Sequence, residues 1–236
     1  MDPTGLLDAV LAVAVYPGAL FLALASLIRR RVAGQGSGPR AHRVPPAISL
    51  VPVLSAVVAT AMLPLTGSPA LRLPPPLGAP GNVVAIVVLL AIATDLGAGS
   101  RAAAALAAGA ALPVLGLAAS LGTLNVIAIS TAGGTAALVA RAVAAAVLVM
   151  ASSLAGGGRS AAVVAAALAL AGAALVVPSA LRAEPAVLGG LACLGTVVVA
   201  SILARVRDRW PRPLLTVAAT AACVAGTVLA LLAARA

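Results

Sequence analysis

Charged and aromatic residues are scarce in this sequence of 236 residues. Lysine is missing, only five residues are acidic, and Tyr16, Phe21 and Trp210 are the only aromatic residues. Charged residues make up 8% of the chain and hydrophobic residues 63%, whereas soluble globular domains contain roughly 25% charged residues. A surface that water can solvate needs more polar groups than this. The composition therefore excludes a water-soluble domain and indicates that most of the surface faces lipid.

The formal net charge of +10 does not indicate a nucleic-acid partner. The arginines are not gathered on one polar face, and no aromatic residues that could stack on bases lie between them. Positive charge beside apolar segments is instead typical of membrane orientation. The lack of lysine, with abundant alanine, glycine, proline and arginine, is typical of a GC-rich bacterial genome. We therefore expect a multi-pass protein of the bacterial cytoplasmic (inner) membrane.

Residues that usually carry catalysis or bind metals are also few. Cys193 and Cys223 lie in apolar stretches without a CxxC spacing or a histidine partner, so we interpret them as buried, inert thiols. The single histidine, His42, is flanked by arginines and is expected in a solvated loop. The sequence contains no GxSxG, Walker A, HExxH or Cys/His cluster. It therefore predicts no catalytic residue, no metal site and no cofactor bound by this chain.

Long apolar segments fill most of the chain. A transmembrane helix needs about 20 apolar residues, with a range of about 17–25. Breaks at arginine, proline and glycine clusters predict an all-α, polytopic bundle of about eight transmembrane helices in a single domain over 1–236. The predicted spans are 5–28, 47–66, 82–98, 101–121, 133–155, 160–182, 186–204 and 213–234. The segment 123–132 is either a loop or part of a longer or re-entrant span.

The distribution of arginine predicts how these spans are oriented. With eight spans, eleven arginines fall on one side and three on the other, a strong positive-inside bias. The eleven are Arg29, Arg30, Arg31, Arg40, Arg43, Arg101, Arg159, Arg205, Arg207, Arg209 and Arg212. The N-terminus, the C-terminus and the proline-rich 67–81 loop are therefore expected outside. Because Asp2 and Asp8 replace the positive region of a signal peptide, we expect the first span to be retained.

Two ionisable residues are predicted within spans, where such groups are costly and usually functional. Asp95, near the cytoplasmic end of the third span, either joins a proton path, pairs with Arg101 or marks an interfacial helix end. Arg141, in the fifth span, either faces the bundle and stabilises an anionic group or extends toward an interface. So few buried charges favour a scaffold or complex subunit over a stand-alone proton-coupled transporter.

Several short motifs follow one another in the order found in one known family. They are Tyr16-Pro17-Gly18, Arg30 and Arg31 followed by Gln35 and Gly38-Pro39, Val51-Pro52-Val53-Leu54, Leu63-Pro64-Leu65, Gly81-Asn82, Pro113, Arg159 and the basic segment 206–212. In this order the chain resembles membrane subunit 1 of proton-translocating NADH:quinone oxidoreductase (NADH dehydrogenase) and its relatives in membrane-bound hydrogenases.

The resemblance implies an outside N-terminus, eight core spans and a place in a hetero-oligomeric complex. In that family the subunit holds no redox cofactor and anchors the peripheral electron-transfer arm to the membrane. The implied partners are hydrogenase-like soluble subunits and antiporter-like membrane subunits, with a quinone at an interface between subunits. Two family glutamates are replaced by Ala111 and Gly156, and an acidic loop is missing. These departures put quinone reduction and proton translocation by this chain in question.

Two groups of candidate residues follow from this interpretation. The docking-loop candidates are Arg29, Arg30, Arg31, Gln35, Gly38, Pro39, Arg207, Arg209 and Arg212. The proton-path or quinone-cavity candidates are Asp95, Arg101, Arg141 and Arg159. The main alternative is a small stand-alone permease or exporter, for which Arg141 and Asp95 would line a polar cavity. A membrane enzyme acting on lipid-linked substrates is a third alternative.

Overall fold

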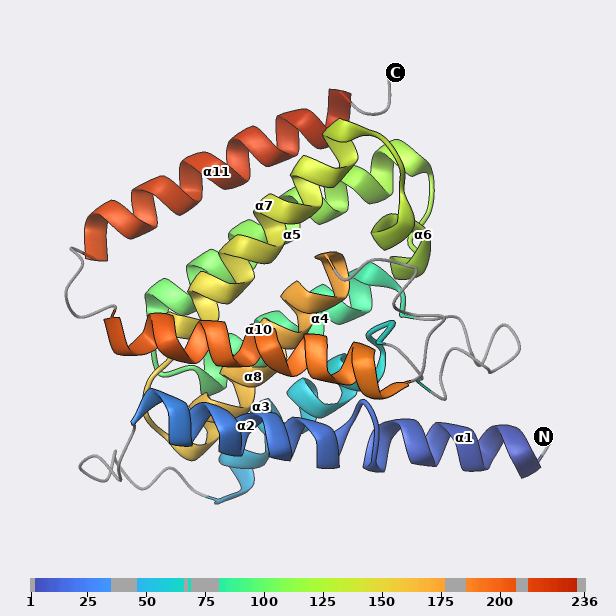
Figure 1. Cartoon of the computed structure of the whole chain (residues 1–236), viewed down its shortest axis with the longest axis vertical. Helices are drawn as coiled ribbons and strands as arrows, with labels where there is room; N and C mark the ends of the chain where they lie inside the picture. The colour runs from blue at the N-terminus through green and yellow to red at the C-terminus, as the bar shows by residue number, and fades with distance from the viewer. Residues whose placement is uncertain are drawn as a thin grey trace.

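The computed structural model describes residues 3–34, 46–65, 68, 81–176, 186–206 and 212–232. Within these ranges the chain forms a bundle of α-helices (Figure 1). The helices are α1 (Pro3–Ala14), α2 (Ala19–Ala33), α3 (Pro46–Ala61), α4 (Val83–Gly97), α5 (Arg101–Leu121), α6 (Val126–Thr131), α7 (Thr135–Leu154), α8 (Arg159–Val176), α10 (Ala186–Val206) and α11 (Arg212–Leu232). The predicted all-α architecture is confirmed for the described residues.

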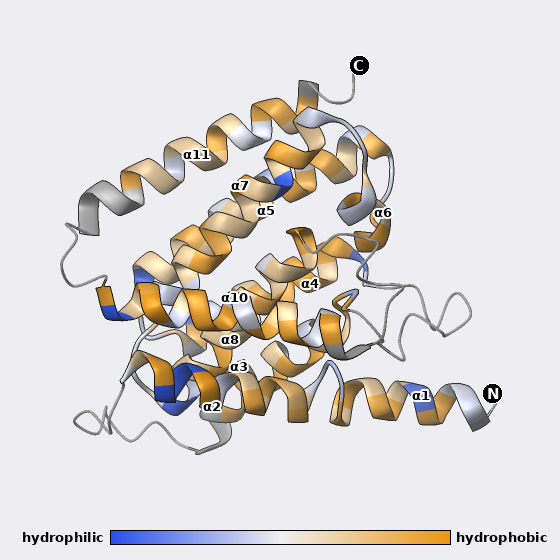
Figure 2. Cartoon of the chain, viewed as in Figure 1, coloured by the Kyte–Doolittle hydropathy of each residue, from blue (hydrophilic) through white to orange (hydrophobic). Residues whose placement is uncertain are grey.

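Five helical segments are long and apolar enough to cross a membrane. They are Thr4–Ala33, Arg101–Leu121, Thr135–Leu154, Arg159–Val176 and Leu188–Val206. Shorter apolar helices occupy Leu50–Ala61, Val83–Gly97 and Val217–Leu231. Each predicted span therefore overlaps an apolar helical segment, and Figure 2 shows hydrophobic colours along most of the bundle. The full count of eight membrane crossings stays a prediction.

The first predicted span consists of two helices rather than one. α1 ends at Ala14 and α2 begins at Ala19, and at the break between them the backbone is packed so closely that a Cβ on Gly18 would overlap the carbonyl oxygen of Val13. Beyond this break α1 extends past the rest of the bundle (Figure 1). The large side chains of Leu6, Leu7 and Val10 on α1 are all exposed, so this helix contributes little to the core.

Helix α8 forms the centre of the bundle. Its side chains are buried almost continuously from Ala161 to Leu175, and helices α2, α3, α4, α7 and α10 pack around it. Small residues allow these helices to approach closely, because a Cβ on Gly172 would lie 3.1 Å from the carbonyl oxygen of Ala145. The predicted span 160–182 thus corresponds to α8, and its last six residues lie outside the described ranges.

The segment 123–132 contains the short helix α6 between α5 and α7. Asn82 and Asn125 cap the N-termini of α4 and α6, since their side-chain oxygens accept hydrogen bonds from Val84 N and Ile127 N, both at 2.9 Å. The two capping residues also form an antiparallel bridge. These contacts fix the start of α6 against the start of α4.

Candidate functional site

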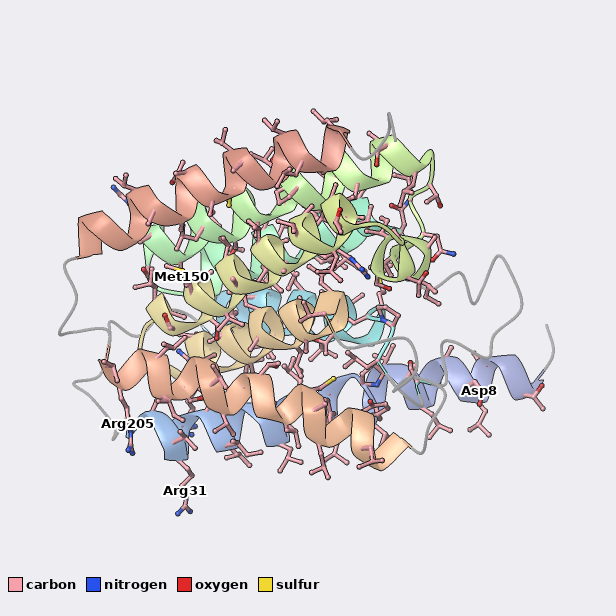
Figure 3. The ribbon with its side chains drawn as sticks, turned by 45° about the horizontal axis from the view of Figure 1, so that its top comes forward. Asp8, Arg31, Met150 and Arg205 are labelled. Atoms are coloured by element: carbon pink, nitrogen blue, oxygen red, sulfur yellow. The ribbon has the colours of Figure 1, made fainter. Side chains whose placement is uncertain are left out.

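Exposed arginines gather at one end of the bundle. Arg31 lies in the last turn of α2 and Arg205 in the last turn of α10, while α5 begins at Arg101 and α8 at Arg159. All four are exposed, and Arg30 beside them is half-buried. We call these five residues the arginine face. Figure 3 shows Arg31 and Arg205 pointing away from the bundle at one end, whereas Asp8 lies at the other end.

Close contacts hold together the helix ends that carry the arginine face. Gly156 N donates to the carbonyl oxygen of Ala98 at 2.8 Å, which joins the α7–α8 turn to the α4–α5 turn. A Cβ on Gly34, just after α2, would lie 3.3 Å from the Arg205 guanidinium, so the ends of α2 and α10 are neighbours. The prediction that Arg31, Arg101, Arg159 and Arg205 share one side therefore agrees with the bundle.

Helix electrostatics explain only half of this arrangement. A cation at a helix C-terminus is stabilised by the helix dipole, which accounts for Arg31 on α2 and Arg205 on α10. Arg101 and Arg159 occupy helix N-termini, where the same dipole disfavours positive charge. Their presence there is better explained by membrane orientation or by an acidic partner than by helix stability.

Arg29 departs from its predicted role in a docking loop. Its side chain is 0% exposed, and Arg29 Nη1 donates a hydrogen bond to Ser152 Oγ on α7 at 3.5 Å. Ser152 Oγ in turn donates to the carbonyl oxygen of Ala165 on α8 at 2.7 Å. Arg29 therefore joins α2 to the α7–α8 pair inside the bundle and cannot contact a partner surface. In the sequence, two adjacent serines, Ser152 and Ser153, near the end of an apolar span are the signal that could have indicated a buried polar contact here.

Asp95 and Arg101 do not form the ion pair that their spacing in the sequence allows. Asp95 is exposed in the last turn of α4, and within the described residues its carboxylate makes no hydrogen bond or ion pair with Arg101. The position fits the interfacial alternative, in which water reaches a helix end.

Arg141 lies toward the opposite end of the bundle from the arginine face. It is half-buried on α7, and its Nη1 donates to the carbonyl oxygen of Ser130 in the last turn of α6. A cation is favourable at that helix C-terminus. Arg141 therefore fastens α6 to α7, which is a structural explanation for its place within a span.

An apolar cavity of about 160 Å³ lies between α4, α5 and α8. Its lining consists entirely of alanine, valine, leucine and isoleucine, and neither Asp95 nor Arg141 takes part. Ala111, the position at which the resemblance would place a glutamate, is one of the lining residues. Apolar cavities of this size stay dry. The cavity thus offers no polar path for a proton or an ion. No other acidic residue lines it in place of the family glutamate.

Filling this cavity is expected to stabilise the protein. Ala111→Leu adds apolar atoms at a half-buried lining position, and cavity-filling substitutions commonly raise the free energy of unfolding by about 0.5–2 kcal/mol. Thermal unfolding in detergent micelles measures the change. Ala105→Leu on the same helix is the control, because Ala105 is exposed and outside the cavity lining. An equal shift for both variants would contradict the expected role of the cavity.

The two cysteines lie inside the bundle. Cys193 and Cys223 are buried as predicted, with exposures of 1% and 2%. The described residues contain no group of three or more His, Cys, Asp or Glu side chains that could hold a metal ion.

Five of the docking candidates and the single histidine lie outside the described ranges, and so does the Arg212 side chain at the start of α11. These five are Gln35, Gly38, Pro39, Arg207 and Arg209.

No family model and no curated protein matches this chain. The similarity to membrane subunit 1 of NADH:quinone oxidoreductase therefore rests on the short motifs in the sequence and stays a prediction.

Proposed function

We propose that this chain is a membrane-anchor subunit whose arginine face binds an acidic surface of a soluble partner. The observation that carries the proposal is the position of Arg101 and Arg159. Both cations stand exposed at helix N-termini, where the helix dipole disfavours them, and an acidic partner would offset that cost. Arginine suits such a surface because its guanidinium binds carboxylates through two parallel hydrogen bonds.

The interior of the bundle favours anchoring over transport. A stand-alone permease needs polar groups along its pathway. Here the cavity is apolar, Arg141 is held by α6, and Asp95 is exposed near the end of α4. These positions support the anchor proposal over the permease alternative.

The specific complex is proposed from the sequence motifs. We infer a complex-I-like or membrane-bound hydrogenase-like oxidoreductase of the bacterial cytoplasmic membrane, with the arginine face toward the cytoplasm. The partners would be hydrogenase-like soluble subunits and antiporter-like membrane subunits, and a quinone would bind at an interface rather than to this chain alone. The Tyr16-Pro17-Gly18 motif lies at the break between α1 and α2, and the arginine face would be the docking surface.

Copurification from the native host tests this proposal. A C-terminally tagged chain, solubilised gently, is expected to bring down hydrogenase-like soluble subunits together with antiporter-like membrane subunits. Recovery of the chain alone, or only as a homo-oligomer, would remove the proposal and favour the permease.

Neutralising part of the arginine face is expected to release the soluble partner. The double variant Arg31→Gln, Arg205→Gln should lower its recovery about tenfold, which corresponds to roughly 1.4 kcal/mol of binding free energy. The difference from the unchanged chain should be largest at low ionic strength and shrink as salt is added, since salt screens exposed charges. Neutralising two of the eleven arginines leaves a bias of nine against three, so the orientation in the membrane is retained.

The matched control keeps the charge at both positions. Arg31→Lys, Arg205→Lys should retain more of the partner than the glutamine pair, although lysine lacks the two-pronged geometry of arginine. Equal recovery with the glutamine pair and the unchanged chain would exclude these arginines from the docking surface.

A further inference from the structure

We infer that the apolar cavity between α4 and α5 is a binding site for the hydrocarbon chain of a membrane phospholipid. This inference concerns the bundle itself and is independent of the proposed partner. Three observations carry it: where the cavity opens, what lines it and how it is shaped.

The cavity opens sideways between two helices. Among its lining residues only Ala91 on α4 and Ala108 on α5 are exposed, and Val87 and Ala111 beside them are half-buried. The remaining lining residues are buried. In a membrane the exposed faces of these apolar helices meet lipid rather than water. The opening therefore connects the cavity with the hydrocarbon interior of the bilayer.

The lining selects an apolar occupant. Seven of the lining residues are alanines on α4, α5 and α8, whose short side chains leave space that larger residues would fill. An unfilled cavity forfeits the dispersion contacts of its walls, and an apolar cavity of about 150 Å³ in a soluble protein takes up benzene. No lining side chain could bind a phosphate, a sugar or an ion. Hydrocarbon chains are the apolar molecules that a bilayer supplies at high concentration.

The shape of the cavity favours a chain over a compact molecule. Its lining follows α4 from Val83 to Ala91, a rise of eight residues or about 12 Å. At one end Val83 and Val126 line the cavity, and the exposed capping residues Asn82 and Asn125 precede them. A chain that enters between Ala91 and Ala108 would lie along α4 toward this end, and the polar part of the lipid would stay outside the cavity.

Photo-crosslinking in vesicles tests this site. The full chain is reconstituted in phosphatidylethanolamine and phosphatidylglycerol that contain a small fraction of phospholipid with a diazirine in one acyl chain. After illumination, cross-linked peptides are identified by mass spectrometry. The expected result is labelling concentrated on 83–91 and 107–114 rather than spread evenly over all exposed helix faces, those of α10 and α11 included.

Closing the cavity should remove this labelling. Ala111→Leu and, separately, Ala108→Leu should lower the labelling of both peptides at least about fivefold, because the added side chain occupies the space the lipid chain needs. Ala105→Leu, exposed on the same helix but outside the lining, should leave it unchanged. Thermal unfolding confirms that each variant is folded. Even labelling of all exposed helices, or equal labelling of the Ala105 variant and both cavity variants, would overturn the inference.

Discussion

Replacing Arg29 with alanine is expected to lower the free energy of unfolding by about 2–5 kcal/mol, because it removes a large buried side chain and leaves a cavity. Arg29 is 0% exposed and is the largest of the fully buried side chains in the described part of the bundle. Its loss also removes the hydrogen bond to Ser152 Oγ, which connects α2 with α7. Reversible unfolding in mixed micelles, followed by circular dichroism, measures the change.

Two further variants separate packing from charge at this position. Arg29→Met keeps most of the side-chain volume but removes the charge, so it should cost about 2 kcal/mol less than Arg29→Ala if packing dominates. Arg31→Ala removes an exposed arginine of the same helix and should change stability by less than about 0.5 kcal/mol. If methionine proves as costly as alanine, the hydrogen-bonded charge rather than the packing explains why Arg29 is needed.

A second large effect is expected at Gly97, where three helices meet. A Cβ at this position would lie 2.6 Å from Pro52 Cβ on α3 and 2.9 Å from Val164 Cγ2 on α8. Proline is rigid and Val164 is fully buried, so neither can move without shifting its helix. Gly97→Ala is therefore expected to lower the free energy of unfolding by about 1–3 kcal/mol.

The same substitution elsewhere in the bundle provides the comparison. Gly195 lies within α10, and a Cβ added there would meet nothing within 4 Å. Because alanine favours the helix over glycine, Gly195→Ala should raise stability by up to about 1 kcal/mol. Opposite signs for the two glycine substitutions would identify the close contact at Gly97 as the cause. A neutral Gly97→Ala would show that α3 adjusts freely against α4.

The positions of the helices could be predicted because the hydrophobicity and the length of an apolar segment determine where a helix forms. The spans containing Pro52 and Pro113 are helices as expected, since neighbouring helices tolerate proline within an apolar segment. The division of the first span could not be predicted in this way, although the Tyr16-Pro17-Gly18 motif lies at the break. At this break the backbone leaves no room for a side chain at Gly18, and apolar composition carries no signal for so close a backbone approach.

The candidate site was only partly accessible to sequence reasoning. Counting arginines predicted which helix ends would lie together, because helices cross the membrane alternately. It could not predict that Arg29 turns inward while Arg31, two residues later, points away from the bundle. It also could not place the cavity, since alanine fills most helices of this chain and only their packing shows which alanines leave space.

The central position of α8 has a consequence for how the protein is made. α8 is apolar enough to enter the bilayer as an independent helix, yet its final neighbours are protein on nearly every side. Of the described helices packed against it, only α10 follows it in the chain. During synthesis, α8 is therefore inserted into a bundle that is still open on one side, and lipid occupies that side until α10 emerges. Its alanines and leucines suit both environments, because they can face lipid first and the side chains of α10 afterwards.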